Sequence, residues 1–433
     1  MSDSNLEKRI KNKKAKVAVV GLGYVGLPLA ISFVKKGFHV LGIEVDGTRL
    51  HKIQEKSSYI TDISDRQLSG ALKTGRFHTS GEFSSLKDAG VIIICVPTPL
   101  KKKYLPDISY IKKAVKAISR NLKRGSLVIL ESTTYPGTTE EVILPLLEAS
   151  GLRHGKDFYL AFSPERIDPG NSQFPVQKIP KIVGGITPEA TRLAQLVYRS
   201  IVKDAIPVSG ARTAEAVKLL ENSFRLINIA FIDELSMMAH KMNLDIWEIV
   251  KAASTKPFGF MPFYPGPGVG GHCIPKDPLY LYWKARRFGF SSRFIKLASS
   301  IINAMPAYVV ERVEDMLKRG RILKKAKILV IGVTYKKDVL DLRKSPAIDI
   351  ISLLKKRNHK VSYFDPIIPY LNIDGISLKS TPLNRATLSK FDCVIIATDH
   401  SVLDYPFILR NSRRIFDTRN AYRKFRDRRI ERL

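Results

Sequence analysis

The sequence predicts an α/β protein with two Rossmann-like doubly wound domains, joined by a central region of long helices. Short apolar runs, typical of buried parallel strands, alternate with helical segments in the first third of the chain and again after residue 326. Between these parts, residues 211–240 keep a helical apolar spacing without a glycine or a proline. We therefore expect three domains, at residues 1–208, 209–318 and 319–433.

Length and composition fit a multidomain globular protein. The chain has 433 residues, which is too many for one core, and 44% of them are hydrophobic. No apolar run approaches the ~18 residues that would cross a bilayer, and residues 1–16 lack the apolar core of a signal peptide. We expect a cytoplasmic protein without membrane insertion.

The charge and the metal-binding residue types exclude some functions. The net charge of +32 could indicate binding to a polyanion, but the basic residues are spread along the chain without a nucleic-acid-binding motif. The three cysteines and eight histidines show no metal-ligand spacing. We therefore expect no nucleic-acid partner and no metal.

A glycine motif follows the first expected strand, residues 16–20, directly. The motif is G-x-G-x-x-G at residues 21–26, and an expected helix at residues 27–36 and a second strand at residues 40–43 come after it. In such a turn the first glycine permits the tight bend, the second lets a pyrophosphate approach the backbone, and the third lets helix and strand pack closely. Unpaired N–H groups at the helix N-terminus can bind the phosphates. The pattern predicts a dinucleotide site.

The end of the second strand favours NAD over NADP. Glu44 stands roughly twenty residues after the motif, where a carboxylate can accept both ribose hydroxyls and repels a 2′-phosphate. Arg49 keeps NADP open, because a nearby arginine can serve the 2′-phosphate, but it can equally be a charge on a helix surface. NAD is the expected cofactor.

Polar residues follow three further expected strands, at residues 91–96, 126–130 and 158–162. Thr98 and Thr133 stand just past strand ends, where doubly wound sheets bind ligands, although turn or capping roles are equally compatible. The loop at residues 163–171 carries Glu165, Arg166 and Asp168 between prolines, which suits a general base.

The long helical segment carries an apolar stripe and a polar pair. Lys218 and Asn222 are four residues apart and therefore share a face, although such a pair is by itself compatible with a solvated surface. Glu215 and Glu221 are expected to face solvent or a partner. The segment could join two domains and form a dimer interface. The residues of the stripe are Ala214, Val217, Leu220, Phe224, Ile227 and Phe231.

One cysteine stands in a loop rich in glycine and proline at residues 267–278. A structural cysteine more often lies in an apolar run, as the other two do. Cys273 instead has His272, Lys276 and Asp277 within four residues, and cationic neighbours favour a thiolate. The segment predicts a nucleophile.

The last third opens a second α/β pattern without a G-x-G-x-x-G motif after its first strand. We expect it to bind something other than the dinucleotide, or to bind a nucleotide differently, and the basic cluster at residues 335–337 suits a pyrophosphate. Its expected strands and helix are residues 326–333, 346–357, 360–364, 394–397 and 414–417.

Taken together, these motifs resemble those of the nucleotide-sugar 6-dehydrogenases, which oxidise a UDP-hexose to a UDP-hexuronic acid. The resemblance covers nearly the whole chain and implies an NAD domain, a helical dimerisation region and a UDP-binding domain. It therefore implies a UDP-sugar substrate and a homodimer. The motifs are GLGYVG at 21–26, VPTP at 96–99, EST at 131–133, SPER at 163–166, KLLEN at 218–222, GGHC at 270–273 and YKKD at 335–338.

The resemblance also implies a mechanism in which two NAD molecules are consumed. Cys273 captures the aldehyde as a thiohemiacetal, which is oxidised to a thioester and then hydrolysed. Lys218 and Asn222 stand at the developing oxyanion, Asp277 handles protons with Lys218 through water, and Glu165 is the base of the hydrolysis. Thr133 belongs to the catalytic set, and His272 is expected to be structural.

The expected ligand contacts are as follows. The NAD contacts are Gly21, Gly23, Tyr24, Val25, Gly26, Glu44, Arg49, Val96, Thr98, Thr133, Cys273, Lys276 and Arg343. The substrate contacts are Glu165, Arg166, Lys218, Asn222, Tyr264, Gly270, Tyr335, Lys336 and Arg419.

The substrate has several candidates. The loop at residues 163–171 is most similar to the branch that acts on UDP-N-acetylglucosamine for surface polysaccharides, and UDP-glucose and UDP-N-acetylmannosamine are the alternatives. Residues 258–264 lack an arginine that the UDP-glucose branch usually has. Two other classes are open: a 6-phosphogluconate-like dehydrogenase, which needs no cysteine, and a non-enzymatic polyanion-binding scaffold.

Overall fold

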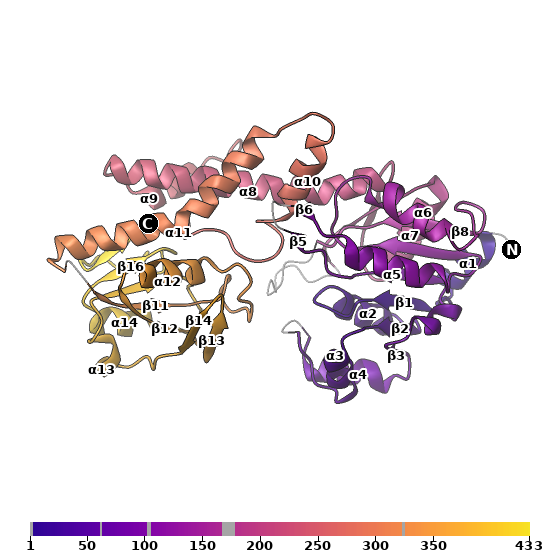
Figure 1. The fold of residues 1–433 in the computed structure, drawn as a ribbon, viewed down its shortest axis with the longest axis horizontal. Coiled ribbons are helices and arrows are strands. Elements are labelled where there is room, and N and C mark those ends of the chain that lie inside the picture. Colours follow the sequence, from indigo (N-terminus) through magenta and orange to yellow (C-terminus); the bar gives the residue numbers. More distant parts are fainter. Residues whose placement is uncertain (1–2, 61–62, 102–104, 167–177, 323–324) are drawn as a thin grey trace. The chain divides into compact units, whose positions relative to one another are not determined.

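The computed structural model describes residues 3–60, 63–101, 105–166, 178–322 and 325–433 (Figure 1). The chain forms two compact units. The first comprises Met1–Glu221 and Leu279–Ser291, and the second comprises Asn222–Pro278 and Ser292–Leu433. The bounds of the three domains expected from the sequence stay a prediction.

The first unit is built on one eight-stranded sheet with the order β10-β9-β8-β7-β4-β1-β2-β3. Six of its strands, from β3 to β8 in that order, are parallel, with Val17 opposite both Val40 and Val91. This is the doubly wound order of a dinucleotide-binding sheet. β9 is antiparallel to β8, and β10 is parallel to β9. The strands are β1 (Val17–Val20), β2 (Val40–Ile43), β3 (Phe77–Ser80), β4 (Val91–Ile94), β7 (Ser126–Leu130), β8 (Phe158–Phe162), β9 (Lys181–Gly185) and β10 (Ala205–Pro207).

Helices cover both faces of this sheet. Alternate residues of β1 belong to different cores: Val17 and Val19 pack with helices α2 and α7, whereas Ala18 and Val20 pack with α5. Because β1, β2, β4, β7 and β8 are buried on both faces, they appear in the sequence as nearly continuous apolar runs, whereas β3 and β10 at the ends of the sheet order are partly exposed. The helices are α1 (Asp3–Lys11), α2 (Gly26–Lys35), α3 (Gly47–Gln54), α4 (Asp65–Lys73), α5 (Ser109–Ser119), α6 (Leu144–Glu148) and α7 (Pro188–Arg199), with a 3-10 turn at Phe83–Asp88, a π-helical turn at Thr139–Ile143 and a short ribbon of β5 (Leu100–Lys101) and β6 (Leu105–Pro106).

Long helices occupy the middle of the chain. Helix α8 (Ala211–Lys241) has 31 residues and is followed by α9 (Ile246–Ala253). Helix α10 (Asp277–Arg286) comes directly after the cysteine segment, and α11 (Arg293–Arg319) leads to the last third of the chain. None of the helices within the described ranges is long and apolar enough to cross a bilayer.

The second unit contains a five-stranded parallel sheet with the order β12-β11-β15-β16-β17. Its two cores lie on opposite faces of β11, with Val330 in one and Leu329 in the other. Its elements are β11 (Lys327–Ile331), α12 (Pro346–Lys356), β12 (Lys360–Phe364), the hairpin of β13 (Tyr370–Ile373) and β14 (Ile376–Lys379), α13 (Arg385–Leu388), β15 (Cys393–Ile396), α14 (Tyr405–Asn411), β16 (Ile415–Asp417) and β17 (Ile430–Arg432).

The structure confirms the predicted fold class of two Rossmann-like sheets with long helices between them in the chain. The expected strands at residues 126–130, 158–162 and 360–364 have the observed bounds. The strand expected at 91–96 ends at Ile94, because its neighbour β1 ends at Val20, the residue opposite Ile94.

Candidate active site

The three glycines of the motif at residues 21–26 have distinct surroundings. Gly21 has a φ of +92°, and Gly26 lies so close to the turn that an added Cβ would stand 1.9 Å from the carbonyl oxygen of Gly21. Among the described residues, a Cβ on Gly23 would meet only an Arg49 nitrogen, at 4.0 Å. Gly21 therefore serves the tight turn and Gly26 the close packing. Gly23 leaves room beside the backbone just before the first turn of α2. These residues fit a dinucleotide phosphate.

Glu44 is buried at the end of β2 and fixes the glycine turn. Its Oε2 accepts from the Leu22 amide at 3.0 Å, and its Oε1 accepts from the Val45 and Asp46 amides at 2.9 and 3.1 Å. Arg49 Nη1 lies 3.3 Å from Oε2. The arginine that kept NADP open in the sequence is therefore paired with the carboxylate that favours NAD.

The residues after β4 and β7 hold each other through backbone groups. The carbonyl of Val96 accepts from the Ser132 hydroxyl at 2.8 Å, and that of Thr98 accepts from the Tyr280 hydroxyl at 2.5 Å. Thr133 is half-buried. The ligand contacts of Val96, Thr98 and Thr133 stay predictions.

Glu165 is buried just beyond β8 and is held from several sides. Its Oε1 accepts from the Arg166 amide at 2.6 Å, and its Oε2 lies 3.3 Å from Lys181 Nζ. Lys218 Nζ, on α8, donates to the carbonyl oxygen of Glu165. Arg166 forms a fork with Glu221, with N···O distances of 2.6 and 3.3 Å. Within the first unit, the structure thus brings the predicted residues Glu165, Arg166 and Lys218 together.

The structure describes only part of the loop at residues 163–171, in which we expect the general base. Asp168 and the rest of residues 167–177 lie outside the described residues. The loop sequence that favoured UDP-N-acetylglucosamine is therefore described only up to Arg166.

In the second unit, Asn222 and Asp277 form one pair. The Asn222 amide nitrogen donates to Asp277 Oδ2 at 2.7 Å, and both side chains are buried. Asn222 comes from α8 and Asp277 is the first residue of α10, so this contact ties the long helix to the helix that follows Cys273.

Cys273 is exposed at the turn that starts α10. Its carbonyl accepts from the amides of Lys276 and Asp277 at 3.1 and 2.8 Å. Lys276 Nζ lies 2.6 Å from His272 Nε2. Burial lowers the pKa of Lys276 to about 8, although the charges of Asp277 and Cys273 act in the opposite direction. Burial, together with the charge of Lys276, lowers the pKa of His272 to about 4. His272 is therefore a neutral acceptor for Lys276 near neutral pH.

Tyr335 packs against the glycines before the cysteine. A Cβ on Gly270 would lie 2.5 Å from Tyr335 Cβ, and one on Gly271 would lie 2.8 Å from the Tyr335 ring. The Gly271 amide donates to the carbonyl of Arg343 at 2.8 Å, and the Arg343 guanidinium forms a fork with Asp341. The structure thus places the predicted residues Gly270, Tyr335 and Arg343 at one loop junction of the second unit.

Three further residues of this unit are expected to bind substrate: Arg419, Tyr264 and Lys336. Arg419 approaches the backbone of Gly266, whose added Cβ would lie 2.9 Å from Arg419 Nη1, and Gly266 donates its amide to Asp233 at 2.9 Å. Tyr264 stacks on Trp247 with ring centroids 6.0 Å apart. Lys336 is half-buried.

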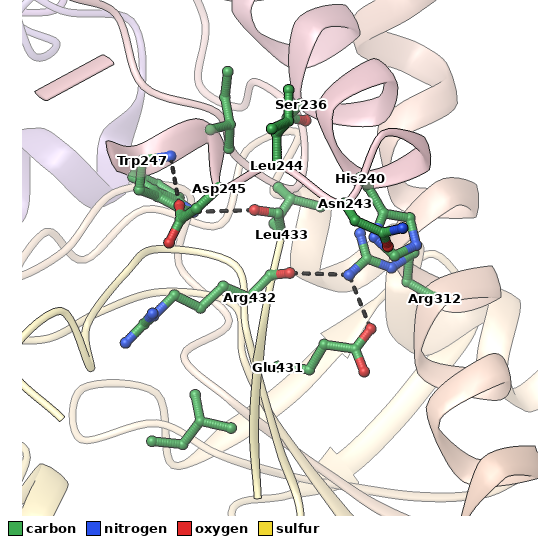
Figure 2. Close-up of a pocket in the computed structure, with 12 residues that line it drawn as sticks. Ser236, His240, Asn243, Leu244, Asp245, Trp247, Arg312, Glu431, Arg432 and Leu433 are labelled. Carbon is green, nitrogen blue, oxygen red and sulfur yellow. Dashed lines mark hydrogen bonds and ion pairs between the residues drawn. The ribbon is translucent and has the colours of Figure 1, made fainter. Parts of the chain in front are cut away.

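A cavity of about 340 Å³ lies elsewhere in the second unit, between the end of α8, α11 and β17 (Figure 2). Trp247 Nε1 donates to the carbonyl of Leu433 at 3.0 Å, and Arg312 Nη2 donates to Glu431 at 2.8 Å. None of the residues expected to bind NAD or substrate lines this cavity.

One sequence interpretation on α8 was wrong. Glu215 does not face solvent or a partner: it is 1% exposed and accepts from the Gly137 amide at 2.5 Å and from the Thr139 amide and hydroxyl at 2.9 and 2.6 Å. The three donors stand at the π-helical turn, whose first N–H groups need an acceptor from outside the helix. Glu221 pairs with Arg166.

Sequence reasoning also missed a buried set around Glu165, formed by Glu131, Lys181 and Tyr198. The available signal was Lys181 itself. It opens a strand that otherwise consists of apolar residues and glycine, and a lysine is rarely buried unless it is paired.

Comparison with known proteins agrees with this arrangement. Three models of the UDP-glucose/GDP-mannose dehydrogenase family match the chain: the NAD binding domain at residues 15–202, the central domain at 212–304 and the UDP binding domain at 329–424. The chain is 39% identical to a UDP-N-acetyl-D-glucosamine 6-dehydrogenase of Pseudomonas aeruginosa, over 90% of this chain and 91% of that protein.

Relatives that carry another substrate name are similarly close. A UDP-N-acetyl-D-mannosamine dehydrogenase of Pyrococcus horikoshii is 37% identical over 89% of both chains. The solved structure of such an enzyme from Pyrococcus horikoshii matches with a TM-score of 0.87 and 34% identity, over 96% of this chain and 99% of that one. The chain therefore belongs to the UDP-glucose/GDP-mannose dehydrogenase family and is an NAD-dependent UDP-sugar dehydrogenase.

Proposed function

We propose that the chain oxidises carbon 6 of UDP-N-acetylglucosamine to the uronic acid, as a precursor for surface polysaccharide. The observation that carries the proposal is the exposed Cys273 at the start of α10, next to Lys276, in a chain that also has NAD-binding and UDP-binding domains. A dehydrogenase that stops at the aldehyde needs no such nucleophile. The similarity to the enzyme of Pseudomonas aeruginosa supports the choice of sugar.

The residues around the glycine turn would hold NAD. The first turn of α2 offers amides to the pyrophosphate, and the buried Glu44 stands where the ribose hydroxyls need an acceptor. When bound, NAD supplies the acceptor for the hydride that leaves carbon 6 in each of the two oxidations.

Cys273 would retain the intermediate between the two oxidations. Its thiolate forms a C–S bond to the aldehyde carbon, and the former carbonyl oxygen takes up a proton to give a thiohemiacetal. This tetrahedral carbon again carries a hydrogen that can leave as hydride, and its loss, together with the hydroxyl proton, gives the thioester. The charge of the Cys273 thiolate raises the pKa of Lys276 against the effect of burial, so the two groups favour each other's charged forms.

Lys218 and Asn222 would donate to the oxygen on carbon 6. Both are buried on α8, four residues apart, and each now donates to an oxygen of its own unit. A donor held in place at a developing oxyanion typically contributes ~2.7–4 kcal/mol to the transition state. Asp277, the acceptor of Asn222, orients that amide and would handle the proton with Lys218 through water.

Glu165 would be the base that hydrolyses the thioester. It takes a proton from water while the water oxygen bonds to the acyl carbon, and the C–S bond breaks to return the Cys273 thiolate. Arg166, Tyr264, Gly270, Tyr335, Lys336 and Arg419 are the proposed further contacts to the UDP-sugar.

The chain would act as a homodimer. Helix α8 exposes Leu220, Phe224, Phe231 and Met238, with exposed fractions of 66, 46, 56 and 50%. Their spacing of four, seven and seven residues puts them on one face of the helix, and exposed apolar faces of this kind mark protein interfaces. Sedimentation equilibrium should give twice the chain mass, and Phe231→Asp should lower the association. The cytoplasmic location stays a prediction.

UDP-N-acetylmannosamine is the second candidate substrate. The relative and the solved structure from Pyrococcus horikoshii both carry that name, at 37% and 34% identity. The two sugars differ only in the configuration at carbon 2, so the proposed roles of Cys273, Lys218 and Glu165 are the same for both.

A turnover assay with purified protein, NAD and each UDP-sugar tests the proposal. We expect the highest kcat/KM with UDP-N-acetylglucosamine, two NADH per sugar and a carboxylate product. A higher kcat/KM with UDP-N-acetylmannosamine or UDP-glucose would reassign the substrate, and one NADH per sugar would contradict the thioester route. No turnover with any UDP-sugar, together with salt-sensitive polyanion binding, would favour a scaffold.

A further inference from the structure

A buried ammonium group holds the candidate base in place. Lys181, the first residue of β9, is 4% exposed, and its Nζ donates to Glu131 Oε1, to Glu165 Oε2 at 3.3 Å and to the carbonyl of Pro164 at 3.3 Å. A lysine ammonium has three N–H donors, so these three acceptors use all of them. Lys181 therefore fixes both the carboxylate of Glu165 and the backbone just before it.

Glu131 is the second acidic group of this set. It is 1% exposed at the end of β7, and its Oε2 accepts from the hydroxyl of the fully buried Tyr198 at 2.5 Å. Four groups therefore meet in the interior of the first unit, from four elements: Glu131 after β7, Glu165 after β8, Lys181 on β9 and Tyr198 on α7. Cys95, after β4, is the fifth titratable neighbour.

The charges of this set do not balance when both carboxyl groups are ionised, because two carboxylates then face one ammonium. Burial raises the pKa of Glu131 to about 7; Lys181 opposes this effect and a hydrogen bond with Glu165 adds to it. Burial alone would lower the pKa of Lys181, but the charges of Glu131 and Glu165 raise it overall. Burial also raises the pKa values of Tyr198 and Cys95. Lys181 thus stays charged, and Glu131 is the carboxyl group of this set whose proton affinity burial raises.

We propose that Lys181 and Glu131 are positioning residues for Glu165, and that Glu131 takes over the proton that Glu165 removes from the attacking water. The inference rests on the proposed role of Glu165 as the hydrolytic base. During hydrolysis the water oxygen bonds to the acyl carbon, the Cys273 thiolate leaves, and the proton of the water goes to Glu165. Transfer of that proton to the ionised Glu131 carboxylate restores the Glu165 carboxylate, and Glu131 gives the proton up to solvent after the uronate has left and before the next turnover.

Substitutions of Glu131 and Lys181 distinguish a positioning role from a role in proton transfer. Glu131→Gln removes the charge and keeps the shape, because the amide oxygen can accept from Lys181 while the amide N–H donates to the Tyr198 hydroxyl. Lys181→Met removes the ammonium, and Lys181→Arg restores a charged donor. Lys284→Met is the matched control, because Lys284 is also buried and pairs with Glu141 at 2.7 Å without contacting Glu165.

The readout is the hydrolysis of the covalent enzyme intermediate. In single turnovers followed by intact-protein mass spectrometry, we expect Glu131→Gln to slow adduct loss at least tenfold and to remove the inflection near pH 7 from its pH profile. We expect Lys181→Met to slow it by about 100-fold, as a displaced catalytic group does, and Lys181→Arg to recover part of that loss. The NADH formed before hydrolysis and the Lys284→Met control should keep their wild-type rates.

An infrared titration of the free protein tests the protonation of Glu131 without turnover. We expect the absorption of a protonated buried carboxyl group to disappear as the pH rises through about 7 in the wild type and to be missing in Glu131→Gln. Identical spectra in the two proteins would overturn the inference even if no UDP-sugar is oxidised. Wild-type hydrolysis rates and pH profiles in both Glu131→Gln and Lys181→Arg would overturn it while leaving the proposed function standing. If Lys181→Met does not fold, as judged by circular dichroism, these two variants decide.

Discussion

Two alanine substitutions in the glycine motif should have opposite effects on folding and on NAD binding. At Gly26 a Cβ would stand 1.9 Å from the carbonyl oxygen of Gly21, which is backbone and cannot swing away as a flexible side chain could. Overpacking typically costs ~1–3 kcal/mol, and a clash with backbone belongs at the upper end, so we expect Gly26→Ala to lose about 3 kcal/mol of unfolding free energy. At Gly23 a Cβ has 4.0 Å to its nearest described neighbour, so Gly23→Ala should stay within about 0.5 kcal/mol of the wild type.

NAD binding should show the opposite order of effects, with the larger loss of affinity in Gly23→Ala. The space beside Gly23 is where the pyrophosphate must approach the backbone, and a methyl group there should raise the Kd for NAD about 100-fold, or ~2.7 kcal/mol. Urea unfolding measures the first effect and titration calorimetry with NAD the second. A Gly26→Ala protein as stable as the wild type would refute the packing argument, and an unchanged NAD affinity of folded Gly23→Ala would refute the placement of the phosphates.

Four further substitutions test other parts of the site. Cys273→Ser should lower uronate formation at least 10³-fold, because a serine hydroxyl is not ionised near neutral pH; undiminished carboxylate product in mass spectrometry would contradict the covalent route. Glu44→Ser removes the proposed acceptor of the ribose and the carboxylate 3.3 Å from Arg49 Nη1, while Asp46 stays 3.6 Å from Arg49 Nε, so the ratio of kcat/KM with NADP to that with NAD should rise at least tenfold; an unchanged ratio would exclude this account of the specificity. Glu215→Ala leaves three buried donors without an acceptor and should cost about 3 kcal/mol in urea unfolding; a loss under about 1 kcal/mol would mean that water replaces the carboxylate. Burial raises the pKa of Asp233 from 3.8 to about 8, so its contribution to stability is complete below pH 3.8 and is lost as the pH rises through 8. Asp233→Asn should therefore lose less stability than the wild type between about pH 4 and pH 8, and parallel curves would contradict the raised pKa.

The sequence predicted those parts of the fold that depend on local pattern. Strands buried on both faces appear as apolar runs, and the helix after Gly21 follows from the glycine spacing, so β1, α2 and β2 were found within one residue. The end of β4 was not predictable in this way. Cys95 and Val96 are as apolar as the strand before them, and the strand stops because its partner β1 stops at Val20.

The buried polar residues were not predictable, because their partners are far away in the chain. Lys181 and Glu131 are 50 residues apart and Tyr198 is 67 from Glu131, so no short window contains the contact. Glu215 shows a different limit. Helical spacing tells which residues share a face of α8, but not which face packs against the π-helical turn at Thr139–Ile143.

The two faces of α8 explain how one helix can carry both the proposed catalytic residues and exposed apolar residues. Lys218 and Asn222 are buried and bonded, so the positions that the proposed chemistry needs are held by contacts within the chain. Leu220 and Phe231 are more than half exposed, and covering such side chains releases ~25 cal/mol per Å² of apolar surface. A helix whose polar positions are already bonded can bind a second copy through its apolar positions without disturbing the catalytic ones. Phe231→Asp should therefore weaken the proposed dimer without changing the kcat of the chains that remain associated, and a loss of both together would mean that the second copy completes the site.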